Sequence, residues 1–550
     1  MIRIVPAKNG SLTACTSNSY LHSRYDPGRE ALRTLSAAEI PSPCTTVIVL
    51  GEGLGYFVQA ARKKLPEARI IAVWYSADLY GHRVARSDAD WFPSPGMPPV
   101  DHFLRSLLKE DDLDGLGVLE PRAVAEAFPQ KAERTRRDLV TVVNRLRANL
   151  NTTGYFGRRW ILNAVANLRF TSGFTALPPP ATPTLAICAS GPTLEDAIPL
   201  FRRLRERVTL WALPSALQTL RANKLQPDMI ILTDAGFYAA EHLFSDREAN
   251  PTPIAMPLTA ARGVWMGKQR VVLLHQGTVL ERLLDVEGFL PSVAVPENPT
   301  VAGTALELAL VAGYRHIVYA GLDMASRDMQ SHARPHRFDH YLAEGESRLE
   351  PAFTRRFERT VIPSKRLGAQ SENPRGVSWR TSNSLSAYAG WFAAQSERLS
   401  GRIFRLFPSP VDPGIAPLDD KAFDTLVSSE TTTASGETFN VRQQQTCKPS
   451  STDVAEKILK LSEVLHQTAL FAMRLPTASG PLTAEDEIKR ELLRLIDLPG
   501  YLRTRRAVGV RPRHNVRDGE TAEIPDAAAE LAESVSRIAR RVAAYAEDSQ

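Results

Sequence analysis

The chain has few cysteines and no long apolar run, and these absences exclude several classes of protein. Its 550 residues include only four cysteines, and none of the four belongs to a CxxC pair. This spacing argues against a disulfide framework and against a structural zinc site. No stretch approaches the ~20 apolar residues that span a bilayer, and the first twenty residues lack the layout of a signal peptide. We therefore expect a cytoplasmic protein with reduced thiols and no membrane contact.

The charge balance is only mildly positive. Lysine and arginine number 67 against 61 aspartates and glutamates, which gives a formal net charge of +6. This excess suits an anionic ligand without requiring nucleic acid, and we expect no nucleic-acid partner. Apolar residues make up 43% and charged residues 23%, as in folded globular proteins. A chain of this length is too long for one ordinary core, and it contains no internal repeat of fixed period.

Short apolar runs alternate with helical patterns through most of the chain. Examples are "TTVIVL" and "IIAVWYS" near the N-terminus and "TLAICAS", "MIILTD" and "HIVYAGLD" further on. Strands that alternate with helices predict a mostly parallel sheet with helices on both faces. The sequence therefore predicts an α/β protein with five segments: an N-terminal Rossmann-like βαβ domain at 1–128, a helical connector at 129–172, a central doubly wound domain at 185–410, a polar linker at 411–451 and a helical C-terminal domain at 452–550.

A glycine turn follows the first long predicted strand of the N-terminal domain. Gly51, Gly53 and Gly55 stand in "VIVLGEGLGY", between a strand and a helix, as in nucleotide-binding domains. The spacing is not GxGxxG, and the second strand lacks an acid directly at its end. We expect a scaffold or partner-docking domain here, with cofactor binding as the alternative. The segments on either side of the central domain are the expected docking regions for a protein partner.

A second turn opens the central domain in "ICASGPTLEDAIPLF". It comprises Ser190, Gly191, Pro192 and Thr193, and a helical pattern begins directly after it. Such a turn at the carboxyl end of a parallel strand presents backbone N–H groups to an anion, aided by the helix dipole. The alternative is purely structural, because Thr193 and Asp196 have the spacing of a capping box. The local pattern alone leaves both interpretations open.

The order of motifs beyond this turn carries a resemblance to a known family. After "SGPTL" come "QPDMIILTDAG", "TVAGTALELALVAGYRHIVYAGLD" and "SHA", and "NTTGYFGRRWILNAVANL" precedes them all. This series resembles the motility-associated flagellin glycosyltransferases, which share their central domain with archaeal hydroxymethylpterin pyrophosphokinases. The likeness covers roughly residues 45–400. A more distant likeness links "SGPTL" and the "AGLD" segment to bacterial CMP-sialic-acid sialyltransferases. Thr193 and Ser331 depart mildly from the usual Ser and Thr at these two positions.

The resemblance implies a set of binding residues. The turn at Ser190–Thr193 would contact the nucleotide or its phosphate. Gly303 and Thr304, in a small-residue turn that opens a helix, would form a second anion site, with a plain N-cap as the alternative. Asp234 and Asp323 both end apolar strands and would contact ribose, base or a divalent ion, or simply cap turns. We favour ligand contact for Asp323, because "GLD" lies in the most specific segment.

Sugar transfer to a hydroxyl needs a base, and the family motif places a histidine downstream of "AGLD". We predict His332 for this role, ahead of its neighbours His336 and His340 in the same polar stretch. The alternative is an exposed histidine in a basic loop. No paired-carboxylate motif such as DxD stands at a strand end, and we expect no required metal cofactor.

These features predict a glycosyltransferase that moves a CMP-linked, nonulosonic-acid-type sugar onto serine or threonine of flagellin. One alternative is a pyrophosphokinase that uses ATP and Mg²⁺ held by acids such as Asp234 or Asp323. Another is a protein without catalytic activity that binds flagellin or a nucleotide sugar. The sequence does not identify the sugar, the acceptor residues or the oligomeric state.

Overall fold

The structure is a computed structural model, and its chain forms two compact units. Unit 1 holds Met1–Tyr155, Leu470–Leu482 and Leu493–Glu533, and unit 2 holds Phe156–Ala469, Thr483–Leu492 and Ser534–Gln550. The five-segment division expected from the sequence stays a prediction, and residues 430–446 of its polar linker lie outside the described part of the chain. The structure describes residues 2–17, 19–243, 252–262, 270–366, 378–396, 398–429, 447–475, 483–509 and 523–547.

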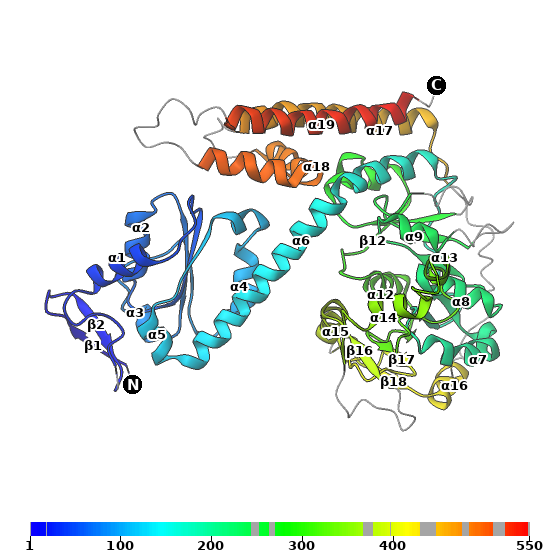
Figure 1. Ribbon diagram of the computed structural model, residues 1–550, viewed down its shortest axis with the longest axis horizontal. Coiled ribbons are helices and arrows are strands. Elements are labelled where there is room, and N and C mark those ends of the chain that lie inside the picture. Colours follow the sequence, from blue (N-terminus) through cyan, green and yellow to red (C-terminus); the bar gives the residue numbers. More distant parts are fainter. Residues whose placement is uncertain are drawn as a thin grey trace. The chain divides into compact units, whose positions relative to one another are not determined.

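Unit 1 is built on a four-stranded parallel sheet (Figure 1). Its strands are β3 (Thr46–Glu52), β4 (Arg69–Trp74), β5 (Ala89–Trp91) and β6 (Leu116–Leu119), in the order β5-β4-β3-β6. The chain adds β4 and β5 on one side of β3 and then returns to place β6 on the other. Around the sheet lie the antiparallel strands β1 (Arg3–Pro6) and β2 (Leu12–Cys15) and the helices α1 (Pro27–Ala37), α2 (Tyr56–Lys64), α3 (Ala77–Gly81), α4 (Val100–Leu107), η1 (Glu110–Gly115) and α5 (Arg122–Ala127).

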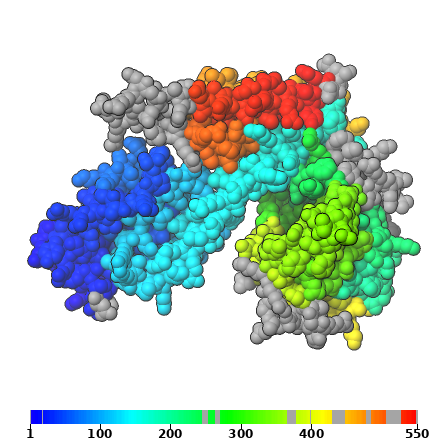
Figure 2. Space-filling view, viewed as in Figure 1, coloured from blue at the N-terminus to red at the C-terminus, as the bar shows by residue number. Residues whose placement is uncertain are grey.

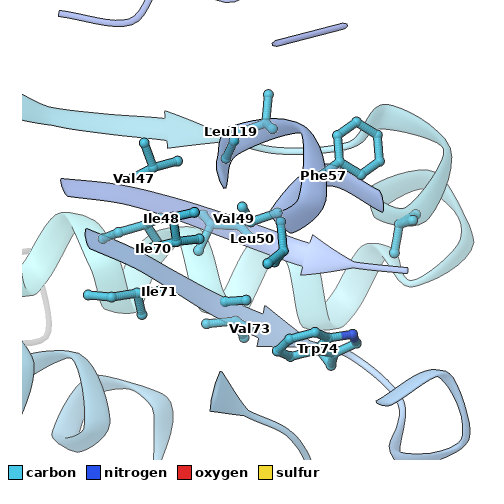
Figure 3. Close-up of a cluster of buried hydrophobic side chains, with 14 of the residues drawn as sticks. Val47, Ile48, Val49, Leu50, Phe57, Ile70, Ile71, Val73, Trp74 and Leu119 are labelled. Carbon is cyan, nitrogen blue, oxygen red and sulfur yellow. The ribbon is translucent and has the colours of Figure 1, made fainter. Parts of the chain in front are cut away.

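The two central strands of this sheet are buried on both faces. Every residue of β3 is buried, which explains why Val47–Leu50 form a continuous apolar run rather than an alternating pattern. Figure 3 shows side chains of β3 and β4 packed together, with Phe57 of α2 and Leu119 of β6 beside them. Trp74 closes the end of β4 and is fully buried. The glycine turn predicted from "GEGLGY" therefore sits at the end of the most buried strand of the unit.

Unit 2 contains a nine-stranded sheet whose paired strands are all parallel. The order is β12-β11-β10-β9-β8-β7-β13-β17-β18. From β7 the chain moves outward to β12, and it then returns to place β13 on the other side of β7. The strands are β7 (Thr184–Cys188), β8 (Thr209–Ala212), β9 (Met229–Ile231), β10 (Ile254–Met256), β11 (Val271–His275), β12 (Ser292–Ala294), β13 (His316–Ala320), β17 (Ile403–Leu406) and β18 (Ala416–Leu418).

Helices cover both faces of this sheet. Leu185 and Ile187 of β7 belong to one apolar cluster, together with α12 (Val301–Ala312) and α15 (Asn383–Gln395). Ala186 and Cys188 point to the other face, where α7 (Leu194–Leu204) and α16 (Asp420–Ser429) pack. The remaining elements of unit 2 are η2 (Arg205–Arg207), η3 (Pro214–Ala216), α8 (Leu217–Ala222), α9 (Phe237–Glu241), α10 (Val279–Leu283), α11 (Val286–Phe289), β14 (Ser326–Arg327), α13 (Asp339–Glu344), α14 (Ala352–Thr360), β15 (Lys365–Arg366) and β16 (Trp379–Thr381).

Four long helices complete the chain and contribute to both units. They are α6 (Pro129–Phe170), α17 (Ser451–Arg474), α18 (Ala484–Gly509) and α19 (Glu523–Glu547). In unit 2, Ser462 Oγ of α17 donates a hydrogen bond to the carbonyl oxygen of Ala539 in α19. The α/β fold class, the doubly wound sheet and the helical C-terminal region are thus confirmed. Among the described helices, none is long and apolar enough to cross a membrane.

Candidate active site

The candidate site lies where the strand order of unit 2 reverses, between β7 and β13. In doubly wound sheets, ligands bind outside the carboxyl ends of the strands at such a point. Cys188 and Ala320 end the two strands opposite each other. Beyond them the chains stay in contact, because Ala189 N donates to Ala320 O at 2.9 Å and Gly191 N donates to Gly321 O at 2.8 Å. The turn predicted from "SGPTL" and the "GLD" segment therefore form one structure.

Glycine is required at this contact for close approach. A Cβ atom on Gly191 would lie 2.5 Å from both the carbonyl oxygen of Gly321 and Oδ2 of Asp323. Gly321 itself has φ +70°, and a Cβ there would lie 2.5 Å from Ala189 O. Both glycines are thus explained by the packing of two backbone turns.

The carboxylate of Asp323 accepts from both donors of Thr193 in the Ser190–Thr193 turn. Thr193 N donates to Oδ2 at 2.8 Å, and Thr193 Oγ1 donates to Oδ1 at 2.5 Å. Asp323 is only 3% exposed, and burial raises its pKa from 3.8 to about 6 although the bonds from Thr193 oppose this rise. Thr193 makes no side-chain cap with the helix, so the capping box is not formed. In this arrangement, the anion held by the turn is a side chain of the protein.

His332 reaches the same turn from the loop between β14 and α13. Its Nδ1 lies 3.1 Å from Oγ of Ser190, and the neighbouring Ala333 N donates to Ser190 O at 2.7 Å. Glu195 of α7 holds the loop by accepting from Arg334 N at 2.8 Å. His332 keeps contact with solvent, yet desolvation by the surrounding protein lowers its pKa. The pairing of a hydroxyl with a neutral imidazole gives this site a proton acceptor at neutral pH.

Two further histidines, to which the sequence assigned no role, lie behind His332. The ring of His336 stacks on His332 with centroids 4.3 Å apart, and the ring of His242 lies 5.2 Å from that of His336. Burial lowers the pKa of His336 to about 3 and that of His242 to about 4, so both stay neutral. His340, by contrast, packs on Tyr341. A positive charge on His332 would in turn disfavour protonation of His336 and His242.

The remaining predicted residues lie apart from this contact. Gly303 and Thr304 are in the first turn of α12, whose N-cap is Thr300, with Gly303 N bonded to Thr300 Oγ1 at 2.9 Å. A Cβ on Gly303 would lie 3.0 Å from the ring of Trp391, and Thr304 is 1% exposed. Asp234 is exposed and accepts from Gly236 N at 2.6 Å. Their ligand contacts stay predictions.

Asp234 and Asp323, the two acids considered as magnesium ligands, lie apart from each other in the fold. Both oxygens of Asp323 are engaged by Thr193, and Asp234 follows β9, which β8 separates from β7. Across the described residues, no group of three or more His, Cys, Asp or Glu side chains is placed to hold a metal ion. These two residues do not fit a shared magnesium site in this arrangement.

The glycine turn of unit 1 also contains its own anion. Glu52 is fully buried, and its carboxylate accepts from the N–H groups of Gly53, Gly55 and Val58, each at 3.0 Å. Burial raises the pKa of Glu52 to about 7, while these N–H groups favour the charged form. The prediction from "GEGLGY" rested on its glycines and missed the acid between them. The donors that would face a cofactor phosphate are taken by Glu52.

One family model matches a segment that contains both turns of the candidate site. Residues 160–329 match the family model described as "6-hydroxymethylpterin diphosphokinase MptE-like". This segment includes both turns of the site and ends just before His332.

Two curated proteins of Treponema pallidum (strain Nichols), each described as "Uncharacterized protein", are similar in sequence. One is 31% identical over 251 residues, which cover 44% of this chain and 55% of the relative. The other is 31% identical over 121 residues, which cover 21% of this chain and 58% of the relative. The chain thus spans just over half the length of these relatives.

A solved structure shares the fold over the whole chain. It is described as "Structure of MAf glycosyltransferase from Magnetospirillum magneticum AMB-1", with a TM-score of 0.61 and 14% sequence identity. The alignment covers 100% of this chain and 93% of that chain. With the matched MptE-like segment, this confirms the resemblance drawn from the motifs, and at this identity the structural likeness concerns the fold.

Proposed function

We propose that unit 2 is a glycosyltransferase that moves a nonulosonic-acid-type sugar from a CMP-linked donor onto serine or threonine hydroxyls of flagellin, in the cytoplasm. The observation that carries the proposal is the hydrogen-bonded pair of Ser190 and His332 at the reversal point of a doubly wound sheet. The fold shared with a MAf glycosyltransferase and the matched segment at 160–329 support it.

His332 is the proposed general base. The proton of the acceptor hydroxyl passes to Nε2 of His332 while the acceptor oxygen bonds to the anomeric carbon. The bond from that carbon to the phosphate oxygen breaks, and its electron pair leaves with CMP. A positioned base of this kind contributes typically ~10²–10⁴ in rate.

Ser190 orients His332 for this role, which requires the tautomer that carries the ring proton on Nδ1. With the ring proton on Nδ1, His332 donates to Oγ of Ser190 and keeps a lone pair on Nε2 for the acceptor. The hydroxyl of Ser190 can then donate its own proton to an oxygen of the departing phosphate. Because the N–H groups of Gly191 and Thr193 already face internal acceptors, this hydroxyl is the donor that we assign to the phosphate.

The MptE-like match favours one competing activity, the transfer of pyrophosphate from ATP to a hydroxymethylpterin. That reaction uses Mg²⁺ to neutralise charge on the phosphates. Thermal stabilisation by CMP, CDP, ATP and a pterin, measured in parallel, separates the two activities. A ligand present at 100 times its Kd adds ~2.7 kcal/mol of stability. Stabilisation by ATP and pterin without CMP would replace our proposal, and stabilisation without turnover would indicate a binding protein.

The base is tested by His332→Ala and Ser190→Ala, with His340→Ala as the matched histidine control. We expect His332→Ala to lower turnover by ~10²–10⁴ with little change in donor affinity, since a base acts mainly in the transition state. Transfer is read as the mass gain of purified flagellin, and we expect it to persist in EDTA. Near-parental turnover of His332→Ala would remove His332 from the mechanism, and complete inhibition by EDTA would favour phosphoryl transfer.

A further inference from the structure

Two exposed aromatic side chains stand at the start of α9 in unit 2, and the proposed transfer reaction does not use them. Phe237 is 60% exposed and Tyr238 is 64% exposed. Their ring centroids lie 6.0 Å apart, and the ring planes are inclined at 69°. A third ring can stack on one of two rings inclined in this way and meet the edge of the other, which are the arrangements that aromatic rings prefer. We call these two side chains the aromatic corner.

The aromatic corner lies at the same edge of the large sheet as the Ser190–Thr193 turn. β7, β8 and β9 are neighbouring parallel strands, so their carboxyl ends share one edge. The turn follows β7, and α9 follows β9 after a short connection. Ligands of doubly wound sheets bind at this edge.

The loop that carries His332 runs along this edge from one strand end to the next. Ala333 N donates to Ser190 O after β7 at 2.7 Å. The hydroxyl of Thr219 in α8, which follows β8, lies 3.2 Å from Ala333 O and 3.1 Å from Pro335 O. The loop therefore spans the ends of β7 and β8 before it reaches α9.

Ring contacts connect the end of this loop to the aromatic corner. Phe338 lies 5.7 Å from Tyr238 and 5.3 Å from His336, which stacks on His332 at 4.3 Å. Tyr341 of α13 lies 6.3 Å from Tyr238, and Figure 1 shows α9 and α13 beside each other. In Figure 2 the segment that follows α13, in yellow-green, is exposed on this face of unit 2. Three ring contacts thus separate Tyr238 from the proposed base.

The charges beside the aromatic corner do not favour an anion. Glu241 of α9 is 7% exposed, pairs with Arg337 at 3.6 Å and accepts from the Tyr341 hydroxyl at 3.3 Å. Asp234, in the connection before α9, adds an exposed carboxylate. A neutral planar ring suits such a surface better than a phosphate or an acidic peptide does.

We propose that Phe237 and Tyr238 stack a planar heteroaromatic ring of the substrate whose reacting centre lies at Ser190 and His332. This inference rests on the proposed function, in which the ring is the cytosine base of the donor. In the competing activity the ring is the pterin. Every such ring has a π face, so aromatic side chains bind it through stacking without specific hydrogen bonds.

The test measures binding of CMP and of hydroxymethylpterin to the full chain by isothermal titration calorimetry. The variant Phe237→Ala/Tyr238→Ala removes both rings, and Phe237→Tyr/Tyr238→Phe keeps a ring at each position. A second control, Tyr25→Ala/Tyr155→Ala, removes two rings of unit 1 that are 56% and 71% exposed. We expect the variant without rings to bind its ligand about 5- to 150-fold more weakly and both controls to bind like the parent.

A single variant guards against a general disturbance of the loop, because loss of the Tyr238 ring also removes its contacts with Phe338 and Tyr341. We expect Phe237→Ala alone to weaken binding at least about fivefold without a change in melting temperature. Binding is located by para-fluorophenylalanine at position 238, whose fluorine resonance should shift when CMP or the pterin is added.

The outcomes separate this inference from the proposed function. Equal binding by the parent and the variant without rings would overturn the inference, while the base is judged by the turnover of His332→Ala. Binding of the pterin alone, weakened by loss of the rings, would support the stacking and refute the transfer from a CMP-linked donor. Two results would also overturn the stacking: no binding of either ligand by the parent, or loss of flagellin binding in the variant with unchanged binding of both ligands.

Discussion

Replacement of Thr193 by valine tests whether Asp323 is the anion that organises the site. Valine has nearly the shape of threonine but lacks the hydroxyl that donates to Asp323 Oδ1 at 2.5 Å. Because Asp323 is 3% exposed, water cannot replace this donor without rearrangement. Removing one partner of a buried hydrogen bond costs ~1–3 kcal/mol, and more when the group left is charged.

The effect should depend on pH in a defined direction. In the parent, burial raises the pKa of Asp323 from 3.8 to about 6, so the folded chain binds this proton more tightly than the unfolded chain does. The contribution of this group to stability is therefore full below about pH 3.8 and falls as pH rises through about 6, by about 3 kcal/mol in total. The Thr193 hydroxyl lowers this pKa, so valine should raise it and extend the loss to higher pH.

Hydrogen exchange measured by mass spectrometry is the suitable assay, because a chain of two units need not unfold in one step. The peptides that contain β7 and the start of α7 report the local free energy of opening. We expect Thr193→Val to lower it by ~1–3 kcal/mol at pH 8 and by less at pH 5, and Thr193→Ser to match the parent. Equal losses at the two pH values, or an equal loss in the serine variant, would refute the role assigned to Asp323.

Three further outcomes follow from named contacts. The free energy of opening around Glu52 should fall as pH rises from about 4.5 to about 7, and Glu52→Gln should abolish this dependence in hydrogen exchange, because the amide does not titrate. Gly191→Ala should lower the melting temperature of unit 2, since its Cβ would lie 2.5 Å from a backbone oxygen; an unchanged temperature would contradict the packing account. The kcat/KM of the parent should stay constant as pH falls to 6.5 and decline only below it, because desolvation lowers the pKa of His332.

The strands and their parallel pairing were predictable from sequence because they are buried on both faces. "TLAIC" and "HIVYA" are uninterrupted apolar runs, and the structure places them in the middle of the large sheet. The neighbours of each strand were not predictable in the same way. β13 pairs with β7 across more than a hundred residues of intervening chain, and no local pattern specifies that pairing.

The residues of the candidate site were likewise predictable only where a motif or a local pattern marks them. His332 was predicted from a family motif, and the structure brings it to Ser190. Its neighbour His242 follows a different strand, so no spacing in the sequence connects the two. The N-cap role of Thr300 was predictable from local sequence, because a threonine three residues before the glycine of a small-residue turn is typical of an N-cap. The bond from Gly303 N to this threonine gives that glycine a structural role beside the ligand role predicted for it.

Both glycine turns in this chain hold a carboxylate where a nucleotide phosphate was considered. In unit 1 the acid stands inside the motif at Glu52, and in unit 2 Asp323 arrives from a strand end 130 residues away. A glycine turn that precedes a helix in the sequence predicts a cluster of backbone N–H donors. It does not predict which anion accepts from them. A buried carboxylate in this position fixes the turn without any ligand. In the proposed reaction, the donor phosphate would then be bound by groups at the edge of the turn, and we assign it to the hydroxyl of Ser190, which lies beside His332.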